Sequence, residues 1–460
     1  MKKPNIKKNM QGMLFIFVAM FCVLGGYLLF INVTYGEEWF STPYNPRIST
    51  ANNIANAGDI YDRNGVLLAH SEGSTRHYAQ DADLRRAVSH TVGDVYGKSL
   101  GAETYFAKYL YGHDRGLLNT IATAASGTSG GDVYLTIDAR LCEYIYDNMD
   151  YNGAVVLMDY TTGEVLASVS VPTFDPENIE NDDDETGSKF LNRVVQGRYA
   201  PGSTMKIVTT AAALEQGVTD MEINCTGSAV VGGETVTCPT SSGHGHVDFT
   251  SAFVRSCNIY YAELSVRLGG TAMMRNADKF AFNYEFNFQD FNMLKSNFEL
   301  SGRDYDLAWA GVGQYKDLVT PMHNMMITAG IANGGTVMEP KTLLEVKYGD
   351  RTAYSFSPSR FRDETSPAIA DTISELMRAT VDHGTATSAD IGGVTINGKT
   401  GTAEYVDGGA VKNHSWFVGF SDDPQHPYAI AVILEGAGFG SAHATPLAGQ
   451  IFSKALDLGY

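Results

Sequence analysis

The sequence predicts an α/β protein of the α+β type, in which one antiparallel sheet is closed by distant segments and a helical lobe lies between them. Strand-length apolar runs occur at residues 154–159 and 164–169, and again at 415–420 and 428–434. The sequence between these two pairs is rich in helix formers. Strands from both ends of the unit are therefore expected in one sheet.

Local signals place the individual elements. The first two runs are joined by Tyr160-Thr-Thr-Gly163, and a glycine at this position favours a hairpin turn. Pro201-Gly202 followed by the Ala-rich segment 203–214 predicts a turn that leads into a helix. Residues 447–456 have the apolar spacing of a helix, which we expect to pack against the sheet.

An uncharged segment near the N-terminus predicts a membrane span. Residues 13–31 carry no charge over 19 residues, which at about 1.5 Å per residue nearly matches the roughly 30 Å hydrocarbon layer. A cleaved signal peptide is the alternative, but its apolar core would be only about 7–15 residues long. Four lysines and no acidic residue precede the span, so residues 1–12 are expected in the cytoplasm. The prediction is a single-pass plasma-membrane protein with the rest of the chain outside the cytoplasm.

The rest of the chain is expected to form two domains. Residues 32–130 carry short apolar runs and turn signals such as Asp62-Arg-Asn-Gly65, which predict a small mixed domain next to the membrane, called the pedestal from here on. The stretch at 124–131 is rich in Gly and Ser, as is typical of a flexible joint. We therefore expect a second, larger domain at residues 131–460.

The charge of the chain argues against binding to nucleic acid. The balance is 33 basic minus 52 acidic side chains, or −19, and without the four N-terminal lysines it is 29 minus 52, or −23. A surface this acidic repels phosphate backbones and anionic lipid headgroups. We expect no nucleic-acid partner.

Two cysteines flank a loop rich in Gly, Val and Thr. Cys225 and Cys238 could form a disulfide in an exported domain or remain as two reduced, partly buried thiols, and the sequence leaves both open. The neighbouring His244 and His246 suggest zinc, but Cys-x12-Cys-x5-His-x-His matches no usual ligand spacing. The sequence therefore predicts no metal site, and no cofactor is expected.

Three short motifs supply the parts of a serine acyl-transfer site: Ser203-Thr-Met-Lys206, Ser256-Cys-Asn258 and Lys399-Thr-Gly-Thr402. On a helix, Ser203 and Lys206 share a face, and a buried lysine with a lowered pKa can take the proton of the serine hydroxyl. Taken alone, the pair is weak evidence, because an N-cap serine beside a solvated lysine gives the same pattern.

The second motif supplies a proton relay. Ser256 can pass a proton to the leaving group, and the amide of Asn258 can hold a peptide group of the substrate. Apolar and aromatic residues follow in Ile259-Tyr-Tyr261 and indicate partial burial. A turn that merely caps the next helix is the alternative interpretation.

The third motif is expected on a strand at the edge of the site. Lys399, Thr400 and Thr402 offer cationic and hydroxyl donors to a carboxylate, and Gly401 would let a substrate backbone approach closely. The N–H groups of Ser203 and Thr402 are the expected oxyanion donors. A lysine at a strand edge is otherwise a common solubility device.

Together the motifs resemble those of penicillin-binding proteins and serine β-lactamases, and the similarity extends over residues 131–460. Upstream, Gly58-Asp-Ile-Tyr-Asp-Arg-Asn-Gly65 is similar to the first pedestal motif of class B penicillin-binding proteins, the monofunctional membrane-anchored transpeptidases. That family usually has an arginine immediately before this glycine, whereas this chain has Ala57.

The resemblance implies the penicillin-binding transpeptidase fold and a peptidoglycan D,D-transpeptidase. Ser203 would be acylated by the penultimate D-alanine of a stem peptide, and an amine of a neighbouring stem would then form the crosslink. Lys206 would be the base, Ser256 the relay and Asn258 the amide anchor. β-Lactams would acylate the same serine. A polytopic glycan-polymerising partner in the membrane is implied as well.

The terminal carboxylate of the donor peptide is implied to bind Lys399, Thr400 and Thr402. A D,D-carboxypeptidase or a β-lactamase, in which water resolves the acyl-enzyme, is the enzymatic alternative. The class B pedestal and the lack of an obvious Glu-x-x-x-Asn motif after Ser256 argue against it. A β-lactam sensor or a cell-wall scaffold is the non-enzymatic alternative. The sequence does not distinguish elongation, division or sporulation.

Overall fold

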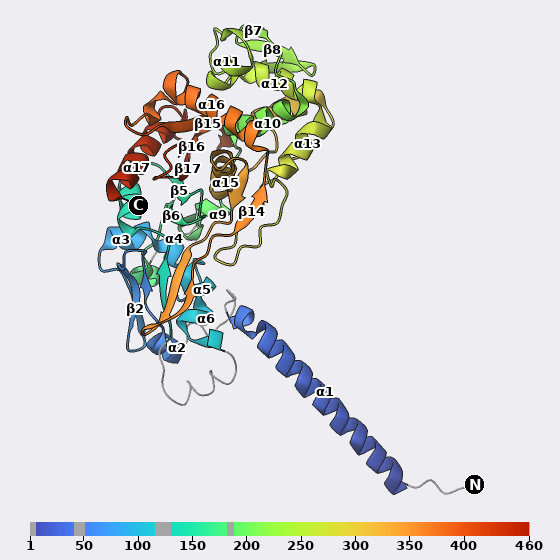
Figure 1. The fold of residues 1–460 in the computed structure, drawn as a ribbon, viewed down its shortest axis with the longest axis vertical. Coiled ribbons are helices and arrows are strands. Elements are labelled where there is room, and N and C mark those ends of the chain that lie inside the picture. The colour runs from blue at the N-terminus through green and yellow to red at the C-terminus, as the bar shows by residue number, and fades with distance from the viewer. Residues whose placement is uncertain (1–5, 41–50, 116–129, 182–187, 460) are drawn as a thin grey trace, which may run out of the picture.

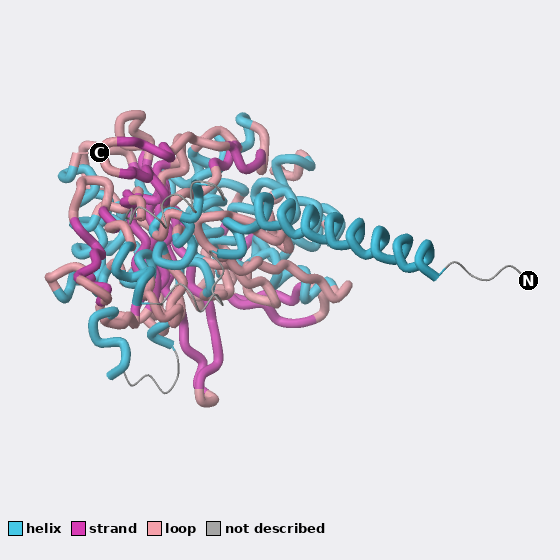
Figure 2. The backbone as a smooth tube through the Cα atoms, turned by 90° about the horizontal axis from the view of Figure 1, so that it is seen from below, coloured by secondary structure: helices cyan, strands magenta, loops and turns pink. Residues whose placement is uncertain are grey.

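The structure is a computed structural model that describes residues 6–40, 51–115, 130–181 and 188–459 (Figure 1). A long N-terminal helix projects from a body whose strands run between helices, as the tube drawing also shows (Figure 2). Most of the Gly/Ser-rich stretch at 124–131 falls outside the described residues.

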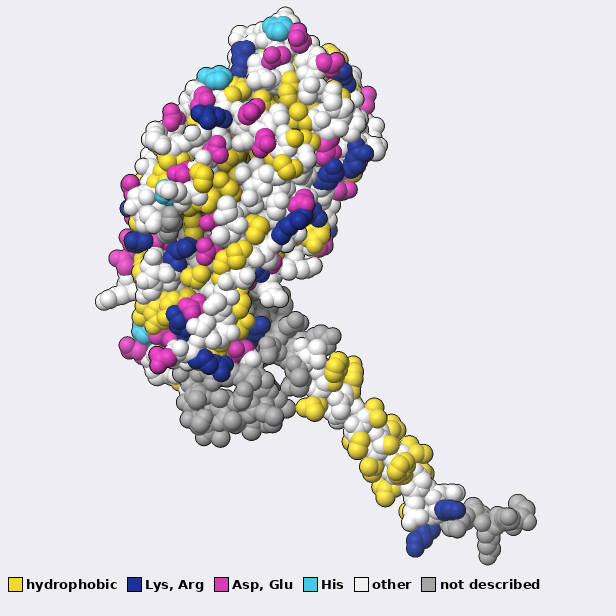
Figure 3. Space-filling model, viewed as in Figure 1, with side chains coloured by type: hydrophobic (Ala, Val, Ile, Leu, Met, Phe, Trp, Pro, Cys, Tyr) yellow, Lys and Arg dark blue, Asp and Glu magenta, His cyan; other side chains and the backbone are white. Residues whose placement is uncertain are grey.

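Helix α1 (Ile6–Phe40) contains the predicted membrane span. Its segment Lys7–Ile31 is long and apolar enough to cross a membrane, and none of its most apolar window is buried within the structure. Figure 3 shows apolar side chains around this helix, clear of the body. The exposed apolar surface fits a single membrane anchor that includes residues 13–31, because such a surface is unfavourable in water.

Strands of the pedestal belong to a six-stranded sheet in the order β13-β12-β4-β1-β2-β3. Its members are β1 (Ile60–Tyr61), β2 (Leu67–Glu72), β3 (Thr75–Tyr78), β4 (Asp132–Leu135), β12 (Leu343–Tyr348) and β13 (Arg351–Ser355). The pedestal helices are α2 (Ala51–Asn56), α3 (Ala82–Ala87), α4 (Ser89–Val92), α5 (Ala102–Tyr105) and α6 (Ala107–Leu110). The sheet thus contains strands from both sides of residue 130, and the domain boundary drawn there stays a prediction.

A buried ion pair between Arg76 and Glu103 lies beside Ala57, the position at which the pedestal motif usually has an arginine. The guanidinium of Arg76 donates to the carbonyl of Gly58 at 2.9 Å, directly after Ala57, and to the Glu103 carboxylate at 2.7 Å. Both side chains are almost completely buried. Desolvation raises the pKa of the Glu103 carboxyl, and the charge of Arg76 opposes this shift. Arg76 therefore places a buried cation beside the start of the pedestal motif.

The catalytic domain is built on a five-stranded antiparallel sheet in the order β15-β16-β17-β5-β6. Its strands are β5 (Gly153–Asp159), β6 (Val165–Val171), β15 (Ile396–Asp407), β16 (Ala410–Ser421) and β17 (Tyr428–Leu434). Segments from the two ends of the domain therefore close one sheet, as the sequence predicted.

Alternating side chains of this sheet divide the interior into two cores. On β5, Ala154 and Val156 belong to the core shared with the helical lobe, whereas Val155 and Leu157 belong to the opposite one. This follows from the period of two along a strand, and each fully buried valine or leucine contributes about 1.5–3 kcal/mol. The two faces of the sheet are thus both covered.

Helices cover the sheet on both faces. The face opposite the lobe packs against α8 (Ala139–Asp147) and α17 (Ala444–Leu458), and the other face packs against α9 (Arg193–Gln196) and α15 (Pro321–Ala332). Helix α16 (Pro367–His383) packs against β15. The lobe contains α10 (Lys206–Gln216), α11 (Phe249–Val254), α12 (Asn258–Leu268), α13 (Gly270–Lys279) and α14 (Asp304–Val312).

Short strands complete the fold. They are β7 (Ile223–Cys225), β8 (Ser228–Val231), β9 (Glu234–Thr237), β10 (Gly245–Val247), β11 (Thr336–Met338) and β14 (Arg360–Asp363). They pair as three two-stranded ribbons, β7 with β10, β8 with β9 and β11 with β14. In Figure 1, β7 and β8 lie at the far end of the lobe beside α11 and α12.

Candidate active site

The first motif lies where the sheet meets the lobe. Ser203 belongs to a single 3-10 turn, Gly202–Met205, and Lys206 is the first residue of α10. The predicted turn followed by a helix is therefore confirmed. The side chain of Ser203 is half-buried and lines a cavity of about 630 Å³, the active-site cavity. This volume is in the usual range for small-molecule sites.

Close packing against the sheet fixes the serine turn in place. The indole N–H of Trp416 donates to the carbonyl of Ala200 at 3.0 Å. Gly202 has φ of +54°, and a Cβ atom there would lie 2.4 Å from the carbonyl oxygen of Thr402. Only glycine suits both this conformation and this contact. Residue 202 thus sets how closely the nucleophile approaches β15.

Lys206 is fully buried, and its amine contacts the second motif. It donates to the carbonyl and the hydroxyl of Ser256 at 2.8 and 3.1 Å, and to Oδ1 of Asn258 at 2.8 Å. Burial lowers the pKa of Lys206 to about 8. Within the described chain, the hydroxyl of Ser203 makes no hydrogen bond. In the site without substrate, the amine of Lys206 therefore donates to Ser256 and not to Ser203.

Ser256 lies between α11 and α12 and is held by two lysines. Its φ is +56°, an uncommon left-handed conformation for a serine. Lys399, also fully buried, donates to the Ser256 hydroxyl at 3.0 Å. Burial first, and then the charge of Lys206, holds the pKa of Lys399 well below its usual value. Two adjacent buried ammonium groups repel each other, so one amine is expected to be neutral.

Lys399 was predicted as a catalytic residue whose amine also binds the terminal carboxylate, and this role stays a prediction. The amine is fully buried and, besides Ser256, it contacts the carbonyl of Thr400 at 3.1 Å. Thr400 and Thr402 do line the cavity, as predicted. The amine of Lys399 is therefore placed to hold the relay serine.

Gly401 also has a different neighbour from the one expected. A Cβ atom at this position would lie 2.8 Å from Cβ of Trp416 and 3.0 Å from Cγ2 of Thr204. The atoms that lie close to Gly401 thus belong to the protein and not to a substrate, and the glycine is buried. Glycine is required there because the serine turn packs against β15.

The remaining predicted residues meet in the active-site cavity. Its lining includes Ser203, Ser256, Asn258, Thr400 and Thr402. These residues come from the serine turn, the junction of α11 and α12, and β15. The three motifs therefore converge on one cavity although they are distant in the sequence.

Sequence reasoning missed several residues of the same cavity. The hydroxyl of Thr385 lies 2.6 Å from that of Thr400, and the amide of Gln314 donates to the carbonyl of Thr402 at 3.1 Å. Trp309 and Asn413 line the cavity as well. Gln314 belongs to a segment that resembles the family, which could have identified it. Thr385 follows the end of α16 with no such signal.

Four side chains beside the cavity form a group that could hold a metal ion. Ligand atoms of Cys225, Cys238, His244 and Cys257 all lie within 4.8 Å of one another. His246, paired with His244 in the sequence analysis, instead contacts Glu222 at 3.1 Å. The sulfurs of Cys225 and Cys238 are 3.7 Å apart and form no disulfide. The sequence analysis missed Cys257 as a member because it was counted only as part of the second motif.

Comparison with known proteins identifies the family of this chain. The family described as "Penicillin binding protein transpeptidase domain" matches residues 153–457. The chain belongs to this family.

Individual relatives agree with this assignment. The chain is 30% identical to peptidoglycan D,D-transpeptidase PbpA of Mycolicibacterium smegmatis, with 72% of this chain and 73% of the relative covered. It is 28% identical to stage V sporulation protein D of Bacillus subtilis, over 91% of this chain and 69% of the relative. The ceftriaxone acyl-enzyme complex of penicillin-binding protein A from M. tuberculosis matches with a TM-score of 0.81 and 26% identity, over 88% of this chain and 100% of that one.

These matches confirm the predicted fold and class. The protein is a class B penicillin-binding protein, a serine-type D,D-transpeptidase.

Proposed function

We propose that the protein crosslinks peptidoglycan stem peptides through an acyl-enzyme on Ser203. The convergence of two buried lysines on the hydroxyl of Ser256, beside Ser203 in one cavity, supports this proposal. It provides a nucleophile, a base with a lowered pKa and a proton relay, which serine acyl transfer requires.

Acylation begins when the neutral amine of Lys206 takes the proton of the Ser203 hydroxyl. The serine oxygen attacks the carbonyl carbon of the penultimate D-alanine, and the N–H groups of Ser203 and Thr402 stabilise the negative oxygen. Ser256 passes the proton to the departing amine and is reprotonated from Lys206, 3.1 Å away. Terminal D-alanine leaves, and the acyl group remains on the serine.

Donor recognition uses the polar lining of the cavity. The hydroxyls of Thr400 and Thr402 bind the terminal carboxylate. The Asn258 amide holds a peptide group of the stem, and its own Nδ2 is fixed on the carbonyl of Thr237 at 3.1 Å. A β-lactam carries an acyl carbon and a carboxylate in a similar arrangement, so it acylates the same serine.

Resolution of the acyl-enzyme uses an amine of a neighbouring stem peptide. The amine attacks the ester carbonyl and gives a proton to Lys206, the C–O bond to Ser203 breaks, and Lys206 returns the proton to the serine oxygen, which regenerates the hydroxyl and the neutral amine. Attack by water instead would give a D,D-carboxypeptidase. The chemistry of acylation is the same in both cases, so the products distinguish them.

A fluorescent penicillin tests the role of Ser203 directly. We expect one covalent label on the full chain in detergent and none on Ser203→Ala, with Ser441→Ala as a control for another serine of the cavity lining. A label that persists in Ser203→Ala would exclude it as the nucleophile. Stem-peptide products with and without an amine acceptor then separate crosslinking from hydrolysis.

We further propose that α1 crosses the membrane with residues 1–12 in the cytoplasm, because four lysines precede the span. Gly25 and Gly26 leave α1 a flat face on which the structure places no neighbouring atom within 4 Å. This face would suit close packing against a polytopic glycan-polymerising protein. Membrane-impermeant labelling of a cysteine introduced at residue 3 or at the exposed Glu72 tests the orientation, and crosslinking from Gly25→Cys tests the packing.

A further inference from the structure

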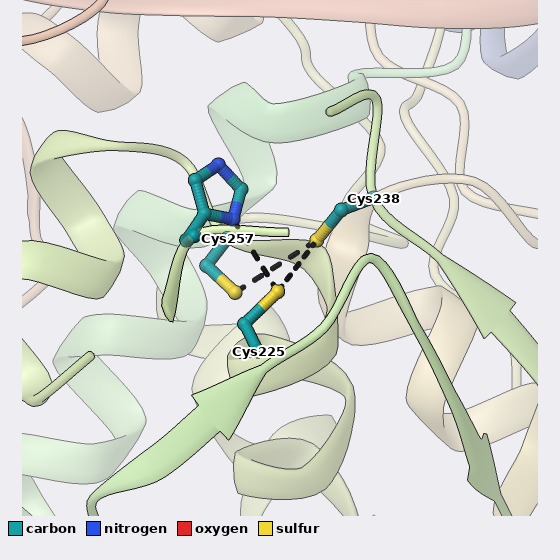
Figure 4. A group of neighbouring side chains, drawn as sticks. Cys225, Cys238 and Cys257 are labelled. Atoms are coloured by element: carbon teal, nitrogen blue, oxygen red, sulfur yellow. Dashed lines mark hydrogen bonds between the residues drawn. The ribbon is translucent and has the colours of Figure 1, made fainter. Parts of the chain in front are cut away.

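Four potential metal ligands come together from segments that are distant in the sequence. Cys225 ends β7, Cys238 follows β9, and Cys257 precedes α12. Figure 4 shows the three cysteine sulfurs pointing toward one another from these segments. Nδ1 of His244 lies 3.5 Å from the sulfur of Cys225. The four ligand atoms thus surround a common point.

The separations match those of a tetrahedral zinc site. With Zn–S bonds of about 2.3 Å and a Zn–N bond of about 2.0–2.1 Å, tetrahedral angles give S···S of about 3.8 Å and S···N of about 3.6 Å. The structure has 3.7 Å from Cys225 to Cys238, 3.8 Å from Cys238 to Cys257, and 3.5 Å from Cys225 to His244. A disulfide would require about 2.05 Å between one pair of sulfurs.

The donor atoms indicate which metal fits. Three sulfurs and one imidazole nitrogen form the usual closed set of a structural zinc site, whereas Mg²⁺ and Ca²⁺ prefer oxygen. Cys225, Cys238 and Cys257 are 1%, 7% and 0% exposed, so water has little access to a bound ion. The set provides four ligands and leaves no position for substrate.

We propose that Cys225, Cys238, His244 and Cys257 bind one Zn²⁺ ion that ties the β7–β10 segment to the Ser-Cys-Asn motif. The three thiols release their protons to solvent as the Zn–S bonds form. No oxidant is needed, and the metal replaces the disulfide as the crosslink of this loop. The proposal depends on the residues beside the active-site cavity and not on the proposed transpeptidase activity.

The site has a direct structural link to catalysis. Cys257 lies between Ser256, which has the left-handed backbone, and Asn258. The amide of Asn258 is bound to Thr237, next to Cys238, and Arg255 donates to the carbonyl of His244 at 2.6 Å. Cys238 and His244 also line the active-site cavity. Zinc would therefore act as a positioning element that holds the relay serine and one wall of the cavity.

Metal analysis of the full chain tests the site. The protein is purified in detergent without chelators or metal-affinity columns, and its zinc is measured by mass spectrometry. We expect about one zinc per chain, and a loss of most of it in Cys225→Ser and His244→Ala. Cys142→Ser is the matched control, because Cys142 is fully buried but lies outside the group, and it should keep its zinc.

Two further measurements need no variant. X-ray absorption at the zinc edge should show three sulfurs at about 2.3 Å and one nitrogen at about 2.0–2.1 Å. Cobalt exchanged into the protein should give tetrahedral d–d bands and sulfur-to-metal charge-transfer absorption. A metal-free chain that takes up neither zinc nor cobalt, or a Cys225–Cys238 disulfide in peptide mapping of protein purified without reductant, would overturn the proposal.

The positioning role has its own readout. Chelation should slow acylation by the fluorescent penicillin about tenfold or more, with zinc restoring it, because small displacements of catalytic groups reduce rates strongly. The pH profile of acylation should also change on chelation, because Ser256 would then move relative to Lys206 and Lys399. Zinc binding without any effect of chelation on acylation would limit the metal to a structural role. Failure of all labelling, with zinc bound, would instead refute the proposed function alone.

Discussion

The amine of Lys399 lies 3.0 Å from the hydroxyl oxygen of Ser256. The lysine of the third motif therefore contacts the hydroxyl of the predicted proton relay, and it is not among the described residues that line the cavity. Lys206 reaches the same hydroxyl from the other side at 3.1 Å. One serine between two buried amines can receive a proton from one and give it to the leaving group, so loss of either amine should interrupt the same step.

Replacing Lys399 by methionine should lower the acylation rate constant about 10²–10⁴-fold, the usual range for loss of a proton-transfer group. The fold should persist, because methionine removes a buried charge and retains much of the side-chain volume. Stopped-flow labelling with a fluorescent penicillin measures the effect, with the exposed Lys316→Met as the control. If the variant weakened only ligand affinity and left the acylation step unchanged, Lys399 would be a carboxylate clamp after all.

Acylation should increase as the pH rises through about 8. The pKa of Lys206 is lowered to about 8 from its ordinary 10.5, first by burial, and only the neutral amine can accept the proton of Ser203. The neutral fraction is then roughly one tenth at pH 7 and most of the population at pH 9. A rate profile between pH 6 and 9.5 checks this, and Lys206→Arg should have no rising limb. A flat profile for the wild type would contradict Lys206 as the base.

The catalytic sheet could be predicted from the sequence because its strands are continuous apolar runs. Residues 154–158 and 428–434 are buried on both faces, so hydrophobicity alone identified these runs, which correspond to β5 and β17. The mixed composition of the pedestal sheet could not be predicted. Its strands β12 and β13 lie more than 200 residues beyond β3, and nothing local in the sequence indicates such a pairing.

The motifs predicted which residues meet in the site, but they did not predict the direction in which each side chain points. Lys399 and Gly401 were correctly expected at the strand beside Ser203, yet the direction of a side chain depends on the register of β15 against β16. Cys257 was missed as a potential ligand because the approach of the segment 225–244 to it is a tertiary contact. Ligand spacing in the sequence finds metal sites only when the ligands are local.

Gly202→Ala should abolish most acylation. Alanine at φ of +54° is strained by about 1 kcal/mol, and its Cβ would also lie 2.4 Å from the carbonyl oxygen of Thr402, which displaces the serine turn. Gly73→Ala is the matched control, with φ of +57° and no atom within 4 Å of the new Cβ. The control should lose about 1 kcal/mol of stability and retain labelling. Equal labelling of the two variants would show that the close approach at residue 202 is unnecessary.

The buried pair of Arg76 and Glu103 should make the pedestal sensitive to loss of one partner. Arg76→Met leaves a fully buried carboxylate without its cation, which should cost about 3–5 kcal/mol in the free energy of unfolding. The double variant Arg76→Met with Glu103→Gln should recover part of this loss, because no charge then remains buried. Urea unfolding of the full chain in detergent, followed by tryptophan and circular dichroism signals, measures both.

An exposed ion pair serves as the comparison that shows whether burial causes the loss of stability. Arg86 and Asp83 lie 3.6 Å apart with side chains 41% and 61% exposed, so Arg86→Met should change the stability by only about 0–1 kcal/mol. A similar small change in Arg76→Met would mean that Glu103 simply takes up a proton. Since desolvation already raises the pKa of Glu103, that outcome would appear as a loss of stability in the variant as the pH rises, because the folded state would then hold a proton that the unfolded state releases.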